Sequence, residues 1–176
     1  MERTLSLIFD IETDGLLYNV STIHCLAIHD LSTDQTLAYN DTGSSEPISR
    51  GLQRLQDADC IIGHNIISYD LPVIRKLYPW FGKPNYVVDT LLLSRLYHPD
   101  MINLDKKHNW EGMPLKLYGK HSLESYGYRL NEHKGDYGTT SDWSDWSQEM
   151  EDYCIQDVNV TTKLWHHFQP YLNGSR

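Results

Sequence analysis

Short apolar runs bounded by polar turns dominate the first half of the chain. Residues 4–10 (TLSLIFD), 22–30 and 35–39 are rich in residues that favour extended backbone, and the polar turn LSTDQ joins the last two. Two shorter runs, 59–63 and 86–88, have the same character. Runs of this length between turn residues predict strands that are buried in a sheet.

Apolar residues recur at helical spacing between and after these runs. Ile48, Leu52 and Leu55 share one face of a predicted helix over 48–56, and Asp89 is predicted to be the N-cap of a leucine-rich helix. Further helices are predicted over 68–77, over 121–130, and from about Ser147 to Phe168.

The order of these elements predicts an α/β fold. Strands come first and then alternate with helices, which indicates a mixed central sheet flanked by helices. The 176 residues contain no internal repeat or low-complexity linker, so we expect a single domain over 1–176. Within it, the proline- and glycine-containing stretch 99–120 is predicted to be a long functional or mobile loop, and 170–176 a tail.

Composition argues against a disordered or membrane-bound chain. Hydrophobic residues make up 40% and charged residues 22%, as in ordinary globular domains. No run approaches the roughly 20 apolar residues of a membrane span. The three cysteines, Cys25, Cys60 and Cys154, are far apart and lack metal-site spacing, so we expect reduced thiols and a cytoplasmic protein.

The charge is negative overall but uneven along the chain. The net charge of −9 argues against a protein that coats nucleic acid through a broad basic surface. Residues 99–135, in contrast, carry six Lys/Arg against five Asp/Glu, which is +1, together with His108, His121 and His133. This stretch is either a solvated loop or a strip that contacts phosphate beside an acidic site.

Asp10 and Glu12 lie at the end of the first predicted strand, in LSLIFDIETDGL. Being two residues apart, their side chains point the same way from an extended strand. Because the preceding residues are apolar, at least one carboxylate emerges at the edge of a core, where it must be paired or bound to a metal. Taken alone, the pair also fits a solvated acidic turn.

Three further acidic residues follow predicted buried strands or sit on the last helix. Asp70 lies in CIIGHNIISYDLPVI, where a carboxylate would also simply stabilise the first turn of a helix. For Asp89, an N-cap role is a sufficient explanation. Asp157 shares a helix face with Tyr153, four residues earlier, and this face lies beside the apolar stripe; a salt bridge to a core Lys or Arg is the alternative.

If the fold brings Asp10, Glu12, Asp70 and Asp157 together, their charge requires cations. Oxygen ligands of this kind suit Mg²⁺ or Mn²⁺. Two such ions about 4 Å apart stabilise both the attacking and the leaving oxygens in phosphate chemistry.

These motifs together resemble the three exonuclease motifs of the DEDD superfamily in its tyrosine-containing, DnaQ-like branch. GHNIISYDLPVI, DTLLLSRLYHP, HSLESYGYRL and YCIQDVNVTTKLW are similar to the exonuclease domain of phage family-A DNA polymerases. The resemblance covers about Leu5 to Leu164. It implies a ribonuclease-H-like fold and a 3′→5′ exonuclease that uses two divalent cations, Mg²⁺ or Mn²⁺.

The resemblance also implies a role for each acid. Asp10 would bridge both ions, Glu12 and Asp157 would complete the ion that holds the attacking water, and Asp70 would serve the second ion. Tyr153 would orient the water, because a phenol with a pKa of about 10 is a poor general base at neutral pH.

Further residues are predicted to bind the substrate. Thr13 and Leu16 occupy positions that meet the 3′-terminal nucleotide in the family, although Leu16 is alternatively a core leucine. His64 and Asn65 are expected at the sugar-phosphate or, alternatively, as turn residues; Asn65 lies five residues before Asp70, where many members have four. Tyr69, Tyr126 and Tyr128 are candidates either for base stacking or for the core. Trp143 and Trp146 are expected to be packing residues, with contact to nucleic acid or a partner as the alternative.

The leading hypothesis is therefore an exonuclease that releases nucleoside 5′-monophosphates from the 3′ end of single-stranded DNA, in proofreading or replication. The alternatives are an exonuclease that trims RNA 3′ ends and a non-catalytic module that docks on nucleic acid or a polymerase. We expect a monomer without membrane attachment, in the host cytoplasm if a phage encodes it, with a separately encoded DNA polymerase as a candidate partner.

Overall fold

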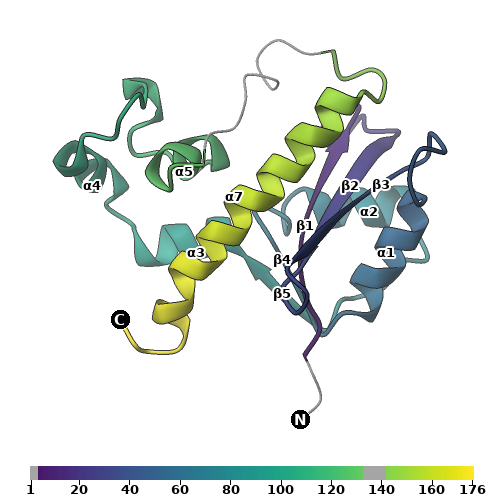
Figure 1. Ribbon diagram of the computed structural model, residues 1–176, viewed down its shortest axis with the longest axis horizontal. Coiled ribbons are helices and arrows are strands. Elements are labelled where there is room, and N and C mark those ends of the chain that lie inside the picture. Colours follow the sequence, from purple (N-terminus) through teal and green to yellow (C-terminus); the bar gives the residue numbers. More distant parts are fainter. Residues whose placement is uncertain (1–3, 133–141) are drawn as a thin grey trace.

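A five-stranded mixed sheet forms the centre of the protein, in a computed structural model that describes residues 4–132 and 142–176 (Figure 1). The strands are β1 (Ser6–Thr13), β2 (Ile23–Asp30), β3 (Gln35–Asn40), β4 (Cys60–Gly63) and β5 (Tyr86–Asp89), in the order β3-β2-β1-β4-β5. β1 pairs antiparallel with β2 and parallel with β4. The predicted α/β fold with a mixed sheet is confirmed.

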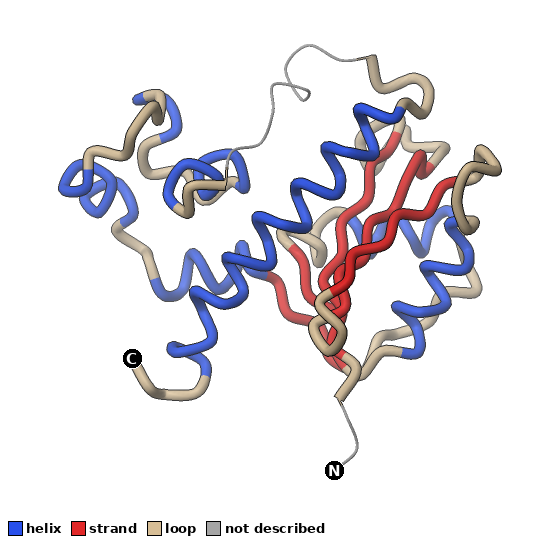
Figure 2. Tube along the Cα trace, viewed as in Figure 1, coloured by secondary structure: helices blue, strands red, loops and turns tan. Residues whose placement is uncertain are grey.

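The central strand β1 sends alternate side chains to two different cores. Leu7, Phe9 and Ile11 pack against the helices α1 (Ile48–Asp57) and α2 (Asp70–Leu77). Ile8 packs on the other face against the long helix α7 (Gln148–Leu172). Because strand side chains alternate, Asp10 and Glu12 share the Ile8 face and lie on the side of α7. Figure 2 shows the sheet as a layer between these helices.

A third core joins the far half of α7 to three shorter helices. These are α3 (Thr90–Tyr97), α4 (Met101–His108) and α5 (Leu123–Arg129). The cluster contains Met101, Leu123 and Tyr126 together with Val160, Leu164 and Phe168 of α7. The same helix therefore covers the sheet with its first half and anchors the α4–α5 region with its second half (Figure 1).

The prediction of a long loop over 99–120 is wrong for much of that stretch. It contains α4 and a short 3₁₀ helix, Leu115–Leu117. The buried positions of α4 are Met101 and Asp105. A charged residue thus replaces the expected apolar one at i+4, and the hydrophobic periodicity that predicts a helix is lost.

Two element ends also differ from the prediction. β1 continues past Asp10 to Thr13, so the two acids lie within the strand. α7 continues to Leu172, through part of the predicted tail 170–176 and with Pro170 inside it. The Tyr171 ring packs 4.9 Å from the Tyr97 ring, and this tertiary contact offsets the hydrogen bond that Pro170 cannot donate.

Cys25, Cys60 and Cys154 are free thiols in the structure. Among the described residues, no helix is long and apolar enough to cross a bilayer.

Candidate active site

The acids that the sequence singled out line one cleft of about 600 Å³. β1 supplies Asp10 and Glu12, the first residue of α2 is Asp70, and α7 supplies Tyr153 and Asp157 one helical turn apart. His64 and Asn65, from the loop between β4 and α2, line the same cleft. The fold thus gathers residues that are up to 147 positions apart in the sequence.

Asp70 is the most deeply buried of the four acids, with 4% of its surface exposed. Its Oδ1 atom has no hydrogen-bond partner among the described residues. Burial, together with the nearby Asp89 and Asp157 carboxylates, raises the pKa of Asp70 to about 7. A charged Asp70 is therefore costly without a cation, which is the expected property of a metal site.

Cys154 lies against the same acids from the α7 side. Its thiol Sγ is 3.6 Å from Asp10 Oδ2 and 3.4 Å from the Asp10 carbonyl oxygen. One donor atom each of Asp10, Glu12 and Cys154 lies within 4.8 Å of the other two. Burial, the neighbouring Cys25 and the Asp10 charge raise the pKa of the Cys154 thiol, so in the metal-free protein the thiol donates a weak hydrogen bond to Asp10.

The donor set fits a hard divalent cation. The four carboxylates that line the cleft offer the oxygen ligands that Mg²⁺ and Mn²⁺ prefer. The Asp70 Oδ1 atom, which has no hydrogen-bond partner among the described residues, is available as a ligand atom.

We expect Asp70→Asn to stabilise the metal-free protein at pH 8. The folded-state pKa of about 7 is above the ordinary value of 3.8, so the favourable contribution of protonated Asp70 is complete below about pH 4 and is lost as the pH rises through 7. Asparagine stays uncharged over this pH range, so the variant does not lose this stability as the pH rises. In chelator, the melting temperature of the variant should exceed that of the wild type increasingly between pH 5 and pH 8, by about 2–4 °C per kcal/mol of repulsion removed.

Added Mg²⁺ provides the matched control for this prediction. It should raise the melting temperature of the wild type more than that of Asp70→Asn, because the variant lacks one carboxylate of the predicted metal site. If the variant melts below the wild type in chelator at pH 8, the charge of Asp70 does not destabilise the metal-free protein, and the prediction is wrong.

Tyr153 is held beside the acids by an aromatic contact. The Trp143 ring meets the Tyr153 ring edge-to-face, with centroids 6.2 Å apart, and both side chains line the cleft. Trp143 is anchored in turn by His24, whose Nε2 atom lies 2.9 Å from the Trp143 carbonyl oxygen. Trp143 and Trp146 both pack against the α7 core, which agrees with the packing role predicted for them.

Asp89 organises the loop that carries His64 and Asn65. Its carboxylate accepts hydrogen bonds from the backbone N–H groups of Leu91, at 2.9 Å, and of Asn65 and Ile67, at 2.9 and 3.1 Å. The N-cap prediction for Asp89 is confirmed, and the two loop contacts are additional. They hold Asn65 in a left-handed conformation, φ +63°, which asparagine tolerates better than most residues.

Thr13 and Leu16 do not line the cleft with the acids. Thr13 is 8% exposed, and its hydroxyl bonds the Gly15 carbonyl oxygen and the Tyr69 hydroxyl. Leu16 is 62% exposed, so the alternative of a core leucine is wrong. Contact of either residue with a terminal nucleotide stays a prediction.

The tyrosine candidates separate by burial. Tyr69 lines the cleft. Tyr126 is only 2% exposed, and its hydroxyl bonds Ser94, so of its two predicted alternatives the core role holds and the stacking role does not. Tyr128 is half-buried, and stacking there stays a prediction.

Cleft residues that the sequence analysis missed come from α3 and from the segment before α5. They are Leu91, Arg95 and residues 119–123. Lys120 gave a signal only as part of the charged stretch 99–135, of which His133 and Lys134 lie outside the described residues, and Arg95 precedes that stretch.

Comparison with known proteins places this fold in a family. A model of the RNase_H superfamily matches residues 7–169. The DNA-directed DNA polymerases of Escherichia phage T7 and Enterobacteria phage T3 are each 31% identical over 95% of this chain, which spans 28% of their length.

Solved structures agree on the fold. The family B DNA polymerase of Pyrobaculum calidifontis matches 97% of this chain and 25% of its own, at 19% identity and TM-score 0.63. Brucella melitensis NrnC matches 97% of this chain and 74% of its own, at 18% identity and the same TM-score, 0.63. The resemblance drawn from the sequence motifs is thus confirmed, and the chain belongs to the RNase H superfamily as a homologue of these phage polymerases.

Proposed function

We propose that the protein is a 3′→5′ exonuclease that releases nucleoside 5′-monophosphates from the 3′ end of single-stranded DNA with two divalent cations. The observation that carries this proposal is the convergence of Asp10, Glu12, Asp70 and Asp157 with Tyr153 on one cleft. Homology to the phage DNA polymerases supports DNA as the substrate and proofreading as the context. Relatives of the fold include an E. coli ExoI–ssDNA complex and NrnC with bound Mg²⁺.

The four carboxylates would hold the ions, which, when bound, neutralise the scissile phosphate and lower the pKa of water. Glu12, Asp70 and Asp157 are each less than a tenth exposed, so their positions are set by packing before a substrate arrives. This preorganisation limits the cost of assembling the site at the moment of reaction.

Tyr153 would orient the attacking water through its hydroxyl. A phenol with a pKa of about 10 stays protonated at neutral pH, so it acts through a hydrogen bond rather than by removing a proton. The contact with Trp143 limits the positions that the ring can take.

Tyr153→Phe should therefore lower kcat by about 10- to 100-fold, because an imprecisely placed nucleophile costs rate without weakening binding. Steady-state kinetics on a labelled oligonucleotide should show KM within about twofold of the wild type. Tyr171→Phe is a matched control on the same helix, outside the cleft, and should leave kcat unchanged. Equal kcat for Tyr153→Phe and the wild type would exclude the role of the hydroxyl.

The function itself is tested with 5′-labelled single-stranded DNA and RNA, with Mg²⁺, with Mn²⁺ and with chelator. We expect a ladder that shortens from the 3′ end on DNA and disappears in chelator. Faster removal of a mismatched than of a matched 3′ terminus at a primer–template junction supports proofreading. Activity on RNA alone would favour RNA trimming, and absence of hydrolysis with either metal and either substrate would leave the non-catalytic docking module.

A further inference from the structure

One side of the cleft carries positive charge. Residues 119–123, here called the 119–123 wall, line the cleft together with Arg95 of α3. Lys120 and Arg95 are both exposed, and neither side chain has an ion pair or hydrogen bond to another described residue. Two cations thus border a cleft whose other lining includes four carboxylates.

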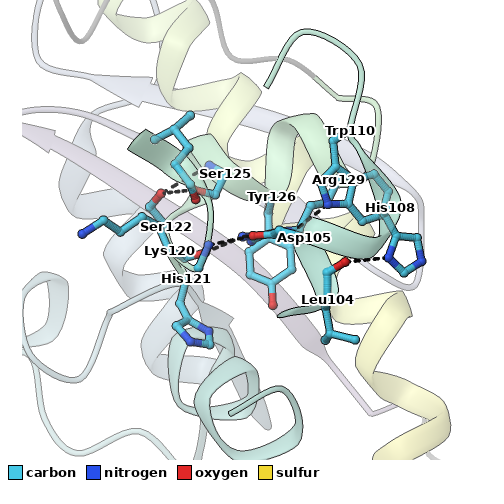
Figure 3. A network of polar contacts seen from close by, with 12 residues as sticks. Leu104, Asp105, His108, Trp110, Lys120, His121, Ser122, Ser125, Tyr126 and Arg129 are labelled. Atoms are coloured by element: carbon cyan, nitrogen blue, oxygen red, sulfur yellow. Dashed lines mark hydrogen bonds and ion pairs between the residues drawn. The ribbon is translucent and has the colours of Figure 1, made fainter. Parts of the chain in front are cut away.

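A buried ion pair next to the 119–123 wall fixes the position of its backbone (Figure 3). Arg129 Nη2 lies 2.7 Å from Asp105 Oδ2, and the exposed fractions of the two side chains are 5% and 0%. The same Arg129 nitrogen donates to the Lys120 carbonyl oxygen at 2.7 Å, and the Gly119 N–H donates to Asp105 Oδ2 at 2.7 Å. The ion pair therefore holds the backbone on both sides of the Lys120 Cα atom.

Two further contacts attach the wall to the loop before α2 and to α3. His64 Nε2 donates to the His121 carbonyl oxygen at 2.9 Å, and His121 Nδ1 lies 2.6 Å from the Ser94 hydroxyl. Gly119 adopts φ +76°, and an added Cβ would lie 3.1 Å from the Ile102 Cβ atom of α4. The wall is thus a closely packed segment with a defined position.

A chain with a net charge of −9 has no general attraction for a polyanion. The carboxylates and their cations account for the scissile phosphate only. The neighbouring phosphates of the strand need cations of their own, and basic side chains provide the sequence-independent part of such binding.

We propose that the 119–123 wall binds a non-scissile phosphate of the substrate strand through Lys120, assisted by Arg95, and that the Asp105–Arg129 ion pair positions it. The inference rests on the proposed function, because it assumes that a nucleic-acid strand enters this cleft. Two basic residues of the stretch 99–135 then have different roles. Arg129 is an internal positioning residue, and Lys120 contacts the phosphate.

The first experiment measures binding without requiring hydrolysis. The Kd of fluorescein-labelled decathymidylate is measured by anisotropy in Ca²⁺, with electrophoresis to verify that the oligonucleotide stays intact. Lys120→Ala should raise Kd about 5- to 20-fold and should reduce the slope of log K against log salt by about 0.7, the value for one phosphate contact on a single strand. Lys116→Ala is the matched control, since this exposed lysine is four residues away and outside the cleft.

The second experiment separates the wall from the chemistry. The dinucleotide TpT has only the scissile phosphate, so the Lys120→Ala variant should hydrolyse it with the kcat and KM of the wild type. Against decathymidylate, KM should rise about as much as Kd, with kcat unchanged. If the wild type hydrolyses neither substrate, the proposed function fails, and the binding comparison still decides whether the wall holds phosphate.

The positioning role is tested by a double-mutant cycle. Arg129→Lys keeps the charge but loses the bidentate fork, so it should raise Kd by shifting the wall rather than by removing a cation. Because it acts through Lys120, its effect should largely disappear in the Lys120→Ala background. Gly119→Ala displaces the wall by a contact with Ile102 and changes no charge. It should also raise Kd, and this effect should also largely disappear in the Lys120→Ala background. This variant replaces Arg129→Lys if the latter misfolds.

Equal Kd values for the Lys120→Ala and Lys116→Ala variants would overturn the phosphate contact. Effects of Arg129→Lys and Gly119→Ala that simply add to that of Lys120→Ala would overturn the positioning role.

Discussion

Asp10→Asn is expected to lower kcat at least about 10³-fold, which corresponds to about 4 kcal/mol of lost transition-state stabilisation. Asp10 lies on the central strand, on the face that meets α7, and it is the acid that contacts Cys154 and clusters with Glu12. Asparagine keeps the size of the side chain but removes the charge that, in the proposed function, neutralises a divalent cation. The loss should therefore be chemical, with the fold intact.

Two measurements check this prediction. A gel assay on 5′-labelled single-stranded DNA gives kcat, and thermal melting with increasing Mn²⁺ reports metal binding. The wild type should be stabilised by metal and Asp10→Asn much less so. Asp57→Asn, an exposed acid on α1 at the other face of the sheet, should behave as the wild type in both assays. Retention of activity within tenfold in Asp10→Asn would reject the assignment of Asp10 as a metal ligand.

The second large effect concerns stability. Asp105→Asn is expected to lower the free energy of unfolding by about 3–5 kcal/mol, because it leaves the buried Arg129 charge without its partner. Asp105 accepts hydrogen bonds from Arg129, Gly119 and Trp110 and is fully buried. For a domain of this size the loss corresponds to a melting temperature lower by about 6–20 °C. Urea unfolding followed by circular dichroism measures it directly.

Asp100→Asn is the control for this variant. Asp100 is an exposed acid next to the same helix. Within residues 4–132 and 142–176 its carboxylate bonds only to the Asn103 side chain, and its replacement should cost less than about 0.5 kcal/mol. A comparable loss in both variants would mean that the ion pair contributes nothing beyond ordinary surface charge.

The pH dependence of the ion pair has a definite sign. Burial by itself would raise the pKa of Asp105, but hydrogen bonds from Arg129, Gly119 and Trp110 outweigh burial and hold that pKa below its usual value. A lowered folded-state pKa contributes stability above the unfolded value of about 3.9, and this stability is lost as the pH falls through the folded pKa. The difference between the wild type and Asp105→Asn should therefore shrink below about pH 4.

Residues whose environment is local were predictable from sequence. The placement of Asp10 and Glu12 follows from alternation along an apolar strand, and that of Tyr153 and Asp157 from helical spacing. The N-cap role of Asp89 follows from its position before a leucine-rich helix. Each of these depends on neighbours within a few residues, which is the range over which periodicity carries information.

Predictions failed where long-range contacts replaced the usual local pattern. The helix α4 was missed because its core position is the charged Asp105, stabilised by an arginine 24 residues away. The extension of α7 past Pro170 depends on the packing of Tyr171 against Tyr97. Tyr126 was a candidate for base stacking until burial in the third core placed it in the interior.

The sequence by itself determined which acids the protein has, their order along the chain and the local element that carries each one. Hydrophobic periodicity is sufficient for that, because it records which face of a strand or helix is buried. Only the tertiary structure decided that Arg129 is an internal ion-pair partner whereas Lys120 lines the cleft. Two basic residues in one polar stretch look equivalent in sequence, and they differ only in what the fold packs around them.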